Sequence, residues 1–489
     1  MRKFAVPGVA VGIVRDGKVA FVKGYGVRTV GTDEPVGSNT LFTVGTNTKQ
    51  FTAAALSLLV DEGKLSWDDR VSDRLPAFRM GDPYVTRELR VRDLLGHRTG
   101  LPSGAGNLLI YPETNFNRSE ALAAFASLPS GTGFRSRYSY SNLAYVIAGE
   151  LVPAVTGSSW DDFVQKRLLD RTGMARCSAS GGPSDNDDVA QPHVLLDGRQ
   201  QRVRTVSYGA AAPANGVWCD VDGLTKWIGM LLNEGRAADG GAVLSPKQLR
   251  EMWSVQIASS VPGTAAELNR THFRGYGLGW NLEDFEGRLR VFHTGGVMGQ
   301  VSHVTLFPEH RLGVVVLSNQ RSTAPLNAIT MHIAKALLGG RQLDWVGHYG
   351  DIHAAQRLKA AAFDTELAAA LTNAGPPPSP LTTYEGTYRD NWRGEVMAEA
   401  GKRGLGISFS RTARLKGRLH FYRDDTFVVR WQERALAEDA FVHFQRGAGG
   451  QVVGVKIESL PSSEGDLDFQ NLKFDRVSSP EPSSQPRTL

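Results

Sequence analysis

The sequence lacks most of the features that would place it in a specialised class of protein. It has only Cys177 and Cys219, too few for a disulfide framework or a structural zinc site, and whether they form a single bridge is left open. No apolar run approaches the roughly 20 residues of a membrane-spanning helix. The eleven histidines show no H-E-x-x-H or other metal-ligand spacing. We therefore expect no metal, no cofactor and no transmembrane segment.

Basic residues are not concentrated in any one stretch. The formal charge is only +5 over 489 residues, and there is no Lys/Arg block with interleaved aromatics, so nucleic-acid binding is not expected. With 41% hydrophobic and 21% charged residues, the composition is that of a soluble globular protein with room for two or more domains. The N-terminus begins with basic and apolar residues, but Pro7 and the direct passage into strand-like sequence argue against a signal peptide.

Strand-like segments lie at both ends of the first 345 residues, with helical pieces between them. Residues 8–24 read as two strands joined by Asp16-Gly17, a pair that tolerates the positive φ of a type I′ turn. Residues 50–61 have apolar side chains at helical spacing, which predicts a helix that is apolar on one side and buried. The sequence therefore predicts one sheet assembled from both ends, with an α-region inserted. The other expected helices are 91–101, 119–128, 142–151 and 224–232, and the other expected strands are 289–292, 302–307 and 312–318.

The remainder of the chain differs in composition. Residues 346–380 combine an Ala-rich helix with the segment N-A-G-P-P-P-S-P, and proline stiffens a spacer, so we expect a linker there. Residues 381–478 contain many short β-like runs with glycine turns, which is typical of a small antiparallel barrel or sandwich. Residues 479–489, S-P-E-P-S-S-Q-P-R-T-L, are expected to be disordered.

One short stretch, F-T-V-G-T-N-T-K-Q-F, has the spacing of a nucleophile and its base. Thr46 precedes Lys49 by three positions, and one helical turn places the hydroxyl and the amine on the same face. The alternative is an ordinary helix N-terminus, with Thr46 as the capping residue and Lys49 in solvent. A T-x-x-K match alone does not decide between them.

Two further motifs favour the first interpretation. Tyr140-Ser141-Asn142 opens a helix-like segment, and His293-Thr294-Gly295-Gly296 follows the expected strand 289–292. T-x-x-K, Y-x-N and H-T-G stand in the order of the S-x-x-K, S-x-N and K-T-G set of penicillin-recognising enzymes. Over about residues 5–340 the chain resembles the serine β-lactamase and DD-peptidase family, in particular its class C β-lactamase, esterase and D-aminopeptidase branch. The matching segments are V-P-G-V-A-V-G-I-V, L-L-G-H-R-T-G-L and L-F-P-E-H-R-L-G-V-V-V-L-S-N.

This resemblance implies a fold and a domain arrangement. The expected fold class is α+β: an antiparallel sheet flanked by helices plus an all-helical region, with the site between them. Residues 1–345 would be the hydrolase domain, 346–380 the linker, and 381–478 a small β-barrel similar to the lipocalin-like domain that follows some of these hydrolases. The resemblance also implies an exported or periplasmic location, which the visible N-terminus does not support.

The resemblance also implies roles for the motif residues. Thr46 would attack the substrate carbonyl and Lys49 would accept its proton, which requires a lowered lysine pKa. Tyr140 would share that proton and pass it on, with a buried structural tyrosine as the alternative. Asn142 would hydrogen-bond Lys49 or the substrate, or else cap the helix. His293 would bind a carboxylate or polarise the Tyr140 hydroxyl, unless it is only structural.

The rest of the H-T-G-G segment would bind substrate. Thr294 belongs to this substrate-binding set, and Gly295 and Gly296 would leave room for a substrate against the strand. The backbone N–H groups of Thr46 and Gly296 would form the oxyanion hole.

The chain departs from the family at the nucleophile, where the family has serine and this chain has Thr46. The additional methyl group restricts χ1, and no lysine in the chain has a serine three residues before it. Two hypotheses follow: a hydrolase that acts on a β-lactam, a D-amino-acid peptide or a small ester, and an impaired homologue that binds such ligands or a partner without turnover. A third is a partner-binding module centred on residues 384–477.

Overall fold

The computed structural model describes residues 1–477 except 129–130, 132, 180, 185–186, 197 and 207. The segment 479–489, which we expect to be disordered, lies outside the described residues. Contacts divide the chain into two compact units: residues 1–111 with 116–358, and residues 112–115 with those from 359 onward. The boundary at residue 358 falls within the segment 346–380 that the sequence indicates as a linker.

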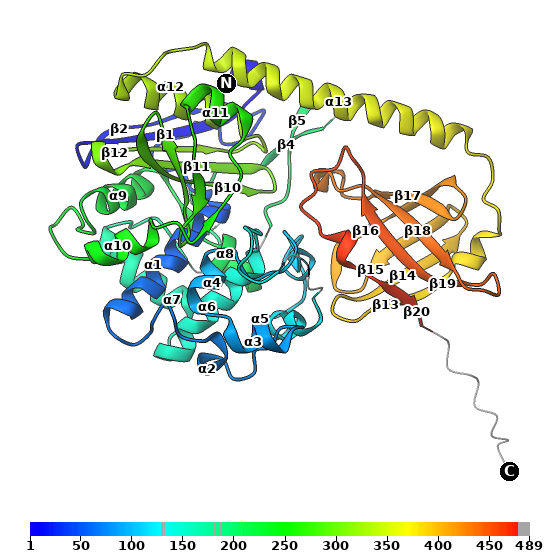
Figure 1. Ribbon diagram of the computed structural model, residues 1–489. Coiled ribbons are helices and arrows are strands. Elements are labelled where there is room, and N and C mark those ends of the chain that lie inside the picture. Colours follow the sequence, from blue (N-terminus) through cyan, green and yellow to red (C-terminus); the bar gives the residue numbers. More distant parts are fainter. Residues whose placement is uncertain are drawn as a thin grey trace. The chain divides into compact units, whose positions relative to one another are not determined.

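The first unit contains an antiparallel sheet whose strand order is β2-β1-β12-β11-β10-β9-β8-β7. Asp16 and Gly17 both have positive φ, 53° and 73°, which matches the predicted type I′ turn between β1 and β2. Because β1 pairs with β12 as well as β2, the sheet is assembled from both ends of the unit, as predicted; in Figure 1 the blue hairpin lies beside the yellow-green β12. The strands are β1 (Gly8–Arg15), β2 (Lys18–Gly26), β7 (Ile257–Ala258), β8 (Arg274–Tyr276), β9 (Asn281–Phe285), β10 (Arg288–Val297), β11 (Gln300–Phe307) and β12 (Leu312–Ser318).

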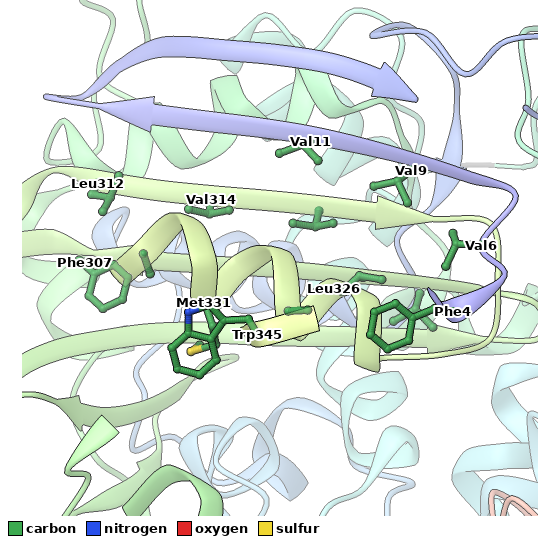
Figure 2. Packing of buried hydrophobic residues seen from close by; sticks show 14 of the residues in the cluster. Phe4, Val6, Val9, Val11, Phe307, Leu312, Val314, Leu326, Met331 and Trp345 are labelled. Carbon is green, nitrogen blue, oxygen red and sulfur yellow. The ribbon is translucent and has the colours of Figure 1, made fainter. Parts of the chain in front are cut away.

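One face of this sheet is covered by α12 (Ala324–Leu338). Alternate strand residues such as Val9, Val11 and Val314 point to this face, because side chains of a strand alternate between its two faces. They pack against Leu326 and Met331 of the helix in one apolar cluster, which Figure 2 shows together with Phe4 and Trp345. The other face carries α9 (Val221–Leu232), which packs against β1, β2 and β12.

The helical region contains α1 (Thr48–Asp61), which begins two residues earlier than expected. The expected burial of α1 is confirmed, and it extends beyond the apolar positions, because residues 48–59 are all buried. The helix packs against α6, α7, α8 and α10, and its buried polar side chains are hydrogen-bonded: Thr52 donates to Pro213 O at 2.6 Å, and Gln50 accepts from Trp227 Nε1 at 2.6 Å. Polar side chains with partners can therefore occupy a buried face.

The helix expected at 91–101 is shorter than predicted. It ends at Leu95, and His97 has a φ of 55°, outside the range of a right-handed helix. The other helices of the unit are α2 (Val71–Arg74), α3 (Pro83–Glu88), α4 (Val91–Leu95), α5 (Arg118–Ala124), α6 (Asn142–Thr156), α7 (Trp160–Val164), α8 (Ala212–Asn215), α10 (Pro246–Met252) and α11 (Gly263–Asn269). Two small strand pairs complete it: β3 (Phe42–Thr43) with β6 (Trp218–Cys219), and β4 (His193–Leu196) with β5 (Arg199–Arg202). In the part of the chain that the structure describes, no helix has the length and apolar character needed to cross a bilayer.

The second unit is a closed antiparallel barrel, which confirms the expected small β-barrel. Aromatic rings pack within it, with the centroids of Tyr384 and Phe444 4.8 Å apart and those of Tyr384 and Phe427 5.0 Å apart. The helix α13 (Trp345–Asn373) has Trp345 in the core of the first unit, while Leu367 packs against Val428 in the second. The strands are β13 (Gly386–Asp390), β14 (Gly394–Gly401), β15 (Gly404–Phe409), β16 (Thr412–Arg423), β17 (Thr426–Trp431), β18 (Ala440–Arg446), β19 (Val452–Ser459) and β20 (Phe474–Arg476).

The two cysteines form a disulfide, which the sequence had left open. Cys177 and Cys219 are 42 residues apart in sequence and both are buried. Cys219 lies in β6 and pairs with Phe42 of β3, the strand that leads into the segment containing Thr46. The bridge therefore ties residue 177 to the strand pair beneath the predicted nucleophile.

Removal of this bridge is expected to destabilise the first unit. Closing a loop of this length restricts the unfolded chain, so the Cys177→Ala/Cys219→Ala variant should lose about 2–4 kcal/mol of unfolding free energy. Urea unfolding followed by tryptophan fluorescence measures the loss. Addition of a reductant should lower the wild-type midpoint and leave that of the double variant unchanged; equal midpoints for oxidised and reduced wild type would contradict the expectation.

Candidate active site

Thr46 lies in a 3-10 turn, Gly45–Asn47, between β3 and α1. Gly45 has a φ of 55°, a conformation that glycine adopts at little cost. The turn is held against the sheet because Ser302 Oγ of β11 donates to Val44 O at 2.6 Å and lies 2.7 Å from the Asn47 side chain. The alternative in which Thr46 caps the helix is not found, since Asn47 occupies the N-cap position.

Lys49 is fully buried in the first turn of α1 rather than in solvent. Its Nζ donates to Asn142 Oδ1 at 2.6 Å and to Ala214 O at 3.3 Å, and it lies over the rings of Tyr140 and Tyr145 at 4.9 and 5.3 Å from their centroids. Among the described residues it has no carboxylate partner. Burial therefore lowers the pKa of Lys49 well below its ordinary value, because the charged form is the one that loses hydration.

The Y-x-N motif lies at the start of α6. Ser141 is the N-cap and its Oγ accepts from Ala144 N at 3.1 Å, so the capping role considered for Asn142 belongs to its neighbour. Asn142 is instead free to point at Lys49, and its Nδ2 donates to Asn107 Oδ1 at 3.1 Å. The start of α6 thus brings Tyr140 and Asn142 to the same amine.

His293 lies inside β10 rather than after a strand end, which corrects the expected boundary. It is buried, and its Nε2 is 3.0 Å from the hydroxyl of Tyr276 in β8, while Nδ1 is 2.7 Å from Thr294 O. Burial and the charge of Lys49 lower the pKa of His293 to about 3. His293 is therefore neutral at physiological pH and offers no positive charge to a carboxylate.

The two glycines of β10 do different things. A methyl group on Gly295 would lie 2.0 Å from Val44 O and 2.4 Å from Ser302 Oγ, whereas one on Gly296 would have no atom within 4 Å. The expectation that Gly295 leaves room for a substrate is wrong, because the main chain before Thr46 fills that space. Only Gly296 has open space beside it.

The hydroxyl of Thr46 donates to Thr294 O at 2.8 Å. The turn and β10 are in close contact here, since a methyl group on Gly45 would be 3.2 Å from Gly296 N. The structure thus brings Thr46 next to the H-T-G-G segment, with its hydroxyl directed at a β10 carbonyl.

A cavity of about 480 Å³ has Thr46, Tyr140, His293 and Thr294 on its wall. The cavity is also lined by a row of charged side chains at opposed positions on three adjacent strands, Arg274, Glu283 and Arg290. Arg290 is 2.8 Å and Arg274 3.8 Å from the Glu283 carboxylate. Two guanidinium groups against one carboxylate leave this row with a net positive charge.

Sequence reasoning missed several of these residues. Tyr276, Arg274 and Arg290 belong to no motif, and only the register of β8, β9 and β10 places them beside the site. His97 does lie in a motif, L-L-G-H-R-T-G-L, but the sequence assigned it no role. Its ring centroid is 4.5 Å from that of Tyr140.

Two family models match the chain. The model described as Beta-lactamase matches residues 1–338, and that described as a domain of unknown function, DUF3471, matches residues 372–476. The first therefore spans the sheet, α1, α6 and β10, and the second spans the barrel.

Individual proteins are similar to the chain at lower identity. Unguisins hydrolase ungD′ of Aspergillus campestris is 28% identical over 416 residues, which cover 79% of this chain and 73% of the relative. Penicillin-binding protein 4 of Amycolatopsis lactamdurans is 29% identical over 321 residues, 64% of this chain and 81% of the relative. The structure of the octameric penicillin-binding protein homologue from Pyrococcus abyssi aligns with a TM-score of 0.60 at 21% identity, covering 97% of this chain and 98% of that one, which shows a shared fold.

The two glycines of β10 provide a matched pair of substitutions. Gly295→Ala should displace the turn that carries Thr46, because the new methyl group would lie 2.0 Å from Val44 O, and overpacking of this kind typically costs about 1–3 kcal/mol. Gly296→Ala should fold with wild-type stability, since its methyl group meets nothing within 4 Å. Thermal unfolding of both variants measures the difference; equal melting temperatures would show that the close approach is not a constraint.

The burial of Lys49 predicts a pH dependence of stability. The unfolded chain binds a proton at Lys49 up to its ordinary pKa, whereas the folded chain releases it at a lower pH. Between these two pH values the wild type should therefore gain stability as pH rises, with a slope of at most about 1.4 kcal/mol per pH unit from this group.

The Lys49→Met variant should lack this component. Urea unfolding of both proteins from pH 6 to pH 10 should give a difference that favours the variant most strongly at low pH and shrinks as pH rises. A difference that stays constant over this range would contradict a lowered lysine pKa.

Proposed function

Because the chain belongs to the Beta-lactamase family, we propose that it is a hydrolase that forms an acyl-enzyme through Thr46. The family supports a serine-hydrolase type of function, and the proposal adds the nucleophile and the substrate class. The observation that carries it is the fully buried Lys49, three residues after Thr46, without a carboxylate partner among the described residues. Burial lowers the pKa of such an amine and so favours its neutral form, which can accept a proton.

In the proposed reaction the Thr46 hydroxyl rotates from Thr294 O toward the substrate. Its oxygen attacks the substrate carbonyl carbon while its proton passes to Lys49. Collapse of the tetrahedral intermediate breaks the bond to the leaving group, which takes up that proton through Tyr140. Water then attacks the acyl-threonine ester by the reverse proton path, releasing the acid and restoring the hydroxyl. Asn142, 2.6 Å from Lys49 Nζ, orients the amine throughout.

The oxyanion of the intermediate would be bound by backbone N–H groups. The amides of Thr46 and Gly296 are candidates because the turn and β10 approach closely at Gly45 and Gly296. Donors fixed in this way stabilise a developing negative charge without reorganisation. The open space beside Gly296 is where the substrate carbonyl would lie.

The charge of the cavity supports a substrate that carries a carboxylate or another anionic group. With His293 neutral, the positive charge facing the cavity comes from Arg274 and Arg290, offset by Glu283. A β-lactam, a D-amino-acid peptide and a small ester with a free carboxylate all fit this description. One relative is named as a hydrolase of unguisins and another as a penicillin-binding protein; the second name supports a β-lactam among the candidate ligands.

A second candidate function is ligand binding without turnover. Its support is the orientation of the Thr46 hydroxyl, which donates to Thr294 O at 2.8 Å. The γ-methyl group of threonine restricts χ1 more than serine does, and rotation toward a substrate then has a cost that a serine does not carry. In this case the cavity would bind the same class of ligand and retain it.

Three proteins distinguish the two functions: wild type, Thr46→Ser and Thr46→Ala. If the chain is a hydrolase, Thr46→Ala should lower the turnover of an activated ester or a chromogenic β-lactam by about a thousandfold or more, as expected for loss of a nucleophile. Thr46→Ser should retain or raise turnover, because the hydroxyl remains and the methyl group is gone.

Intact-mass measurement after mixing with a penicillin provides the direct readout. A mass increase equal to the ligand in the wild type, absent in Thr46→Ala, identifies the acyl-threonine. Wild-type turnover equal to that of Thr46→Ala, together with new activity in Thr46→Ser, would reject the hydrolase and support the binding protein.

A further inference from the structure

His97 lies between α4 and the loop that leads to Tyr140, at the centre of the aromatic side chains around Lys49. It is fully buried and its φ is 55°. A histidine in this left-handed region is uncommon and carries a small conformational cost, which persists only where surrounding contacts hold the residue. The N–H of His97 donates to Leu94 O at 3.4 Å, while its carbonyl and its ring contact the segment 138–145 and Tyr276.

His97 accepts two hydrogen bonds, one from each residue that flanks Tyr140. Ser139 N donates to His97 O at 2.8 Å, and Ser141 N donates to His97 Nδ1 at 3.1 Å. The residues immediately before and after Tyr140 are therefore both fixed by one residue. With this left-handed φ, the main-chain carbonyl and the ring of His97 both accept hydrogen bonds from the same short segment.

The His97 ring also packs against Tyr140 itself. The ring centroids are 4.5 Å apart, and the ring of Tyr276, which hydrogen-bonds His293, lies 4.6 Å from His97 on another side. Two kinds of contact with His97 therefore hold the Tyr140 ring beside Lys49, with its centroid 4.9 Å from Nζ. They are the hydrogen bonds to the flanking main chain and the packing of the two rings.

The hydrogen bonding of His97 fixes its tautomer. Ser141 N–H can only donate, so Nδ1 carries a lone pair and the proton of the neutral ring is on Nε2. Nε2 is buried and has no hydrogen-bond partner among the described residues. Burial lowers the pKa of His97, which favours the neutral ring. A ring whose Nδ1 accepts from a backbone N–H cannot relay a proton from one ring nitrogen to the other, so its contribution to the site is geometric.

We propose that His97 is a positioning residue. Through the hydrogen bond that its Nδ1 accepts from Ser141 N, His97 holds Tyr140 in the position needed for proton transfer. The proposal rests on the proposed function, since it gives Tyr140 a proton to transfer. Its structural part, the placement of Tyr140 by His97, is separate from whether Thr46 supports turnover.

Two amide substitutions test the proposal. His97→Asn places an oxygen close to the position of Nδ1 and tolerates the left-handed φ, so it should keep the bond from Ser141 and turn over an ester at close to the wild-type kcat. His97→Gln carries the same amide one methylene further out, where its oxygen is directed toward the former Nε2. A displacement of Tyr140 by about 1 Å should then lower kcat by about tenfold to a hundredfold, with KM little changed.

A double variant shows whether the effect runs through Tyr140. If it does, His97→Gln in a Tyr140→Phe background should cause no further loss of kcat. Additive losses, a His97→Asn variant as slow as His97→Gln, or a His97→Gln variant with wild-type kcat would each overturn the proposal. Thermal unfolding of each variant identifies any loss that comes from misfolding.

Crystal structures of the two single variants give a readout that does not depend on activity. Tyr140 should keep its position in His97→Asn and move in His97→Gln. If the wild type shows no turnover that depends on Thr46, the proposed function fails, yet this structural comparison still decides whether His97 positions Tyr140. An unmoved Tyr140 in His97→Gln would overturn the proposal.

Discussion

The candidate site depends on one energetically unfavourable feature. The Lys49 amine is buried and has no carboxylate partner among the described residues. Taking an ammonium group out of water is costly, and without a paired charge the group responds by losing its proton. The neutral amine is then held by the Asn142 side chain and the Ala214 carbonyl, and faced by tyrosine rings. When Lys49 is protonated, its positive charge disfavours protonation of His97 and His293. The neutrality of all three nitrogen bases thus follows from a shared, poorly hydrated environment.

Much of the fold could be predicted because it depends on local patterns. The Asp16-Gly17 turn specifies the first hairpin, and the strand-like segments 302–307 and 312–318 form two adjacent strands of the sheet, as predicted. The complete burial of α1 could not be predicted in this way. Gln50 and Thr52 look like solvent-facing residues in the sequence, and only Trp227 and Pro213, more than 150 positions away, supply the partners that allow them inside.

The residues of the candidate site also fall into those that local sequence patterns predict and those that they do not. Motif order brought out Thr46, Lys49, Tyr140, Asn142 and His293, because each lies at a fixed distance from a helix start or in a strand. The close packing of Gly295 against the main chain before Thr46 is a contact between residues about 250 positions apart. Tyr276 and the Arg274–Glu283–Arg290 row depend on strand register, which a one-residue shift would reverse. The two hydrogen bonds that His97 accepts on either side of Tyr140 depend on its backbone conformation, which the sequence pattern does not indicate.

The pairing of β1 with β12 also has a consequence for the order in which the protein can be built. The first strand leaves the ribosome about 300 residues before its partner, and the wall of the cavity formed by β10 is likewise absent until most of the first unit has been made. Contacts between such distant residues carry a large loop-closure cost and form slowly. Until then the β1 edge of the β1–β2 hairpin is unpaired, a surface on which chains can associate wrongly. The geometry of the candidate site is therefore among the last features of this unit to form during synthesis.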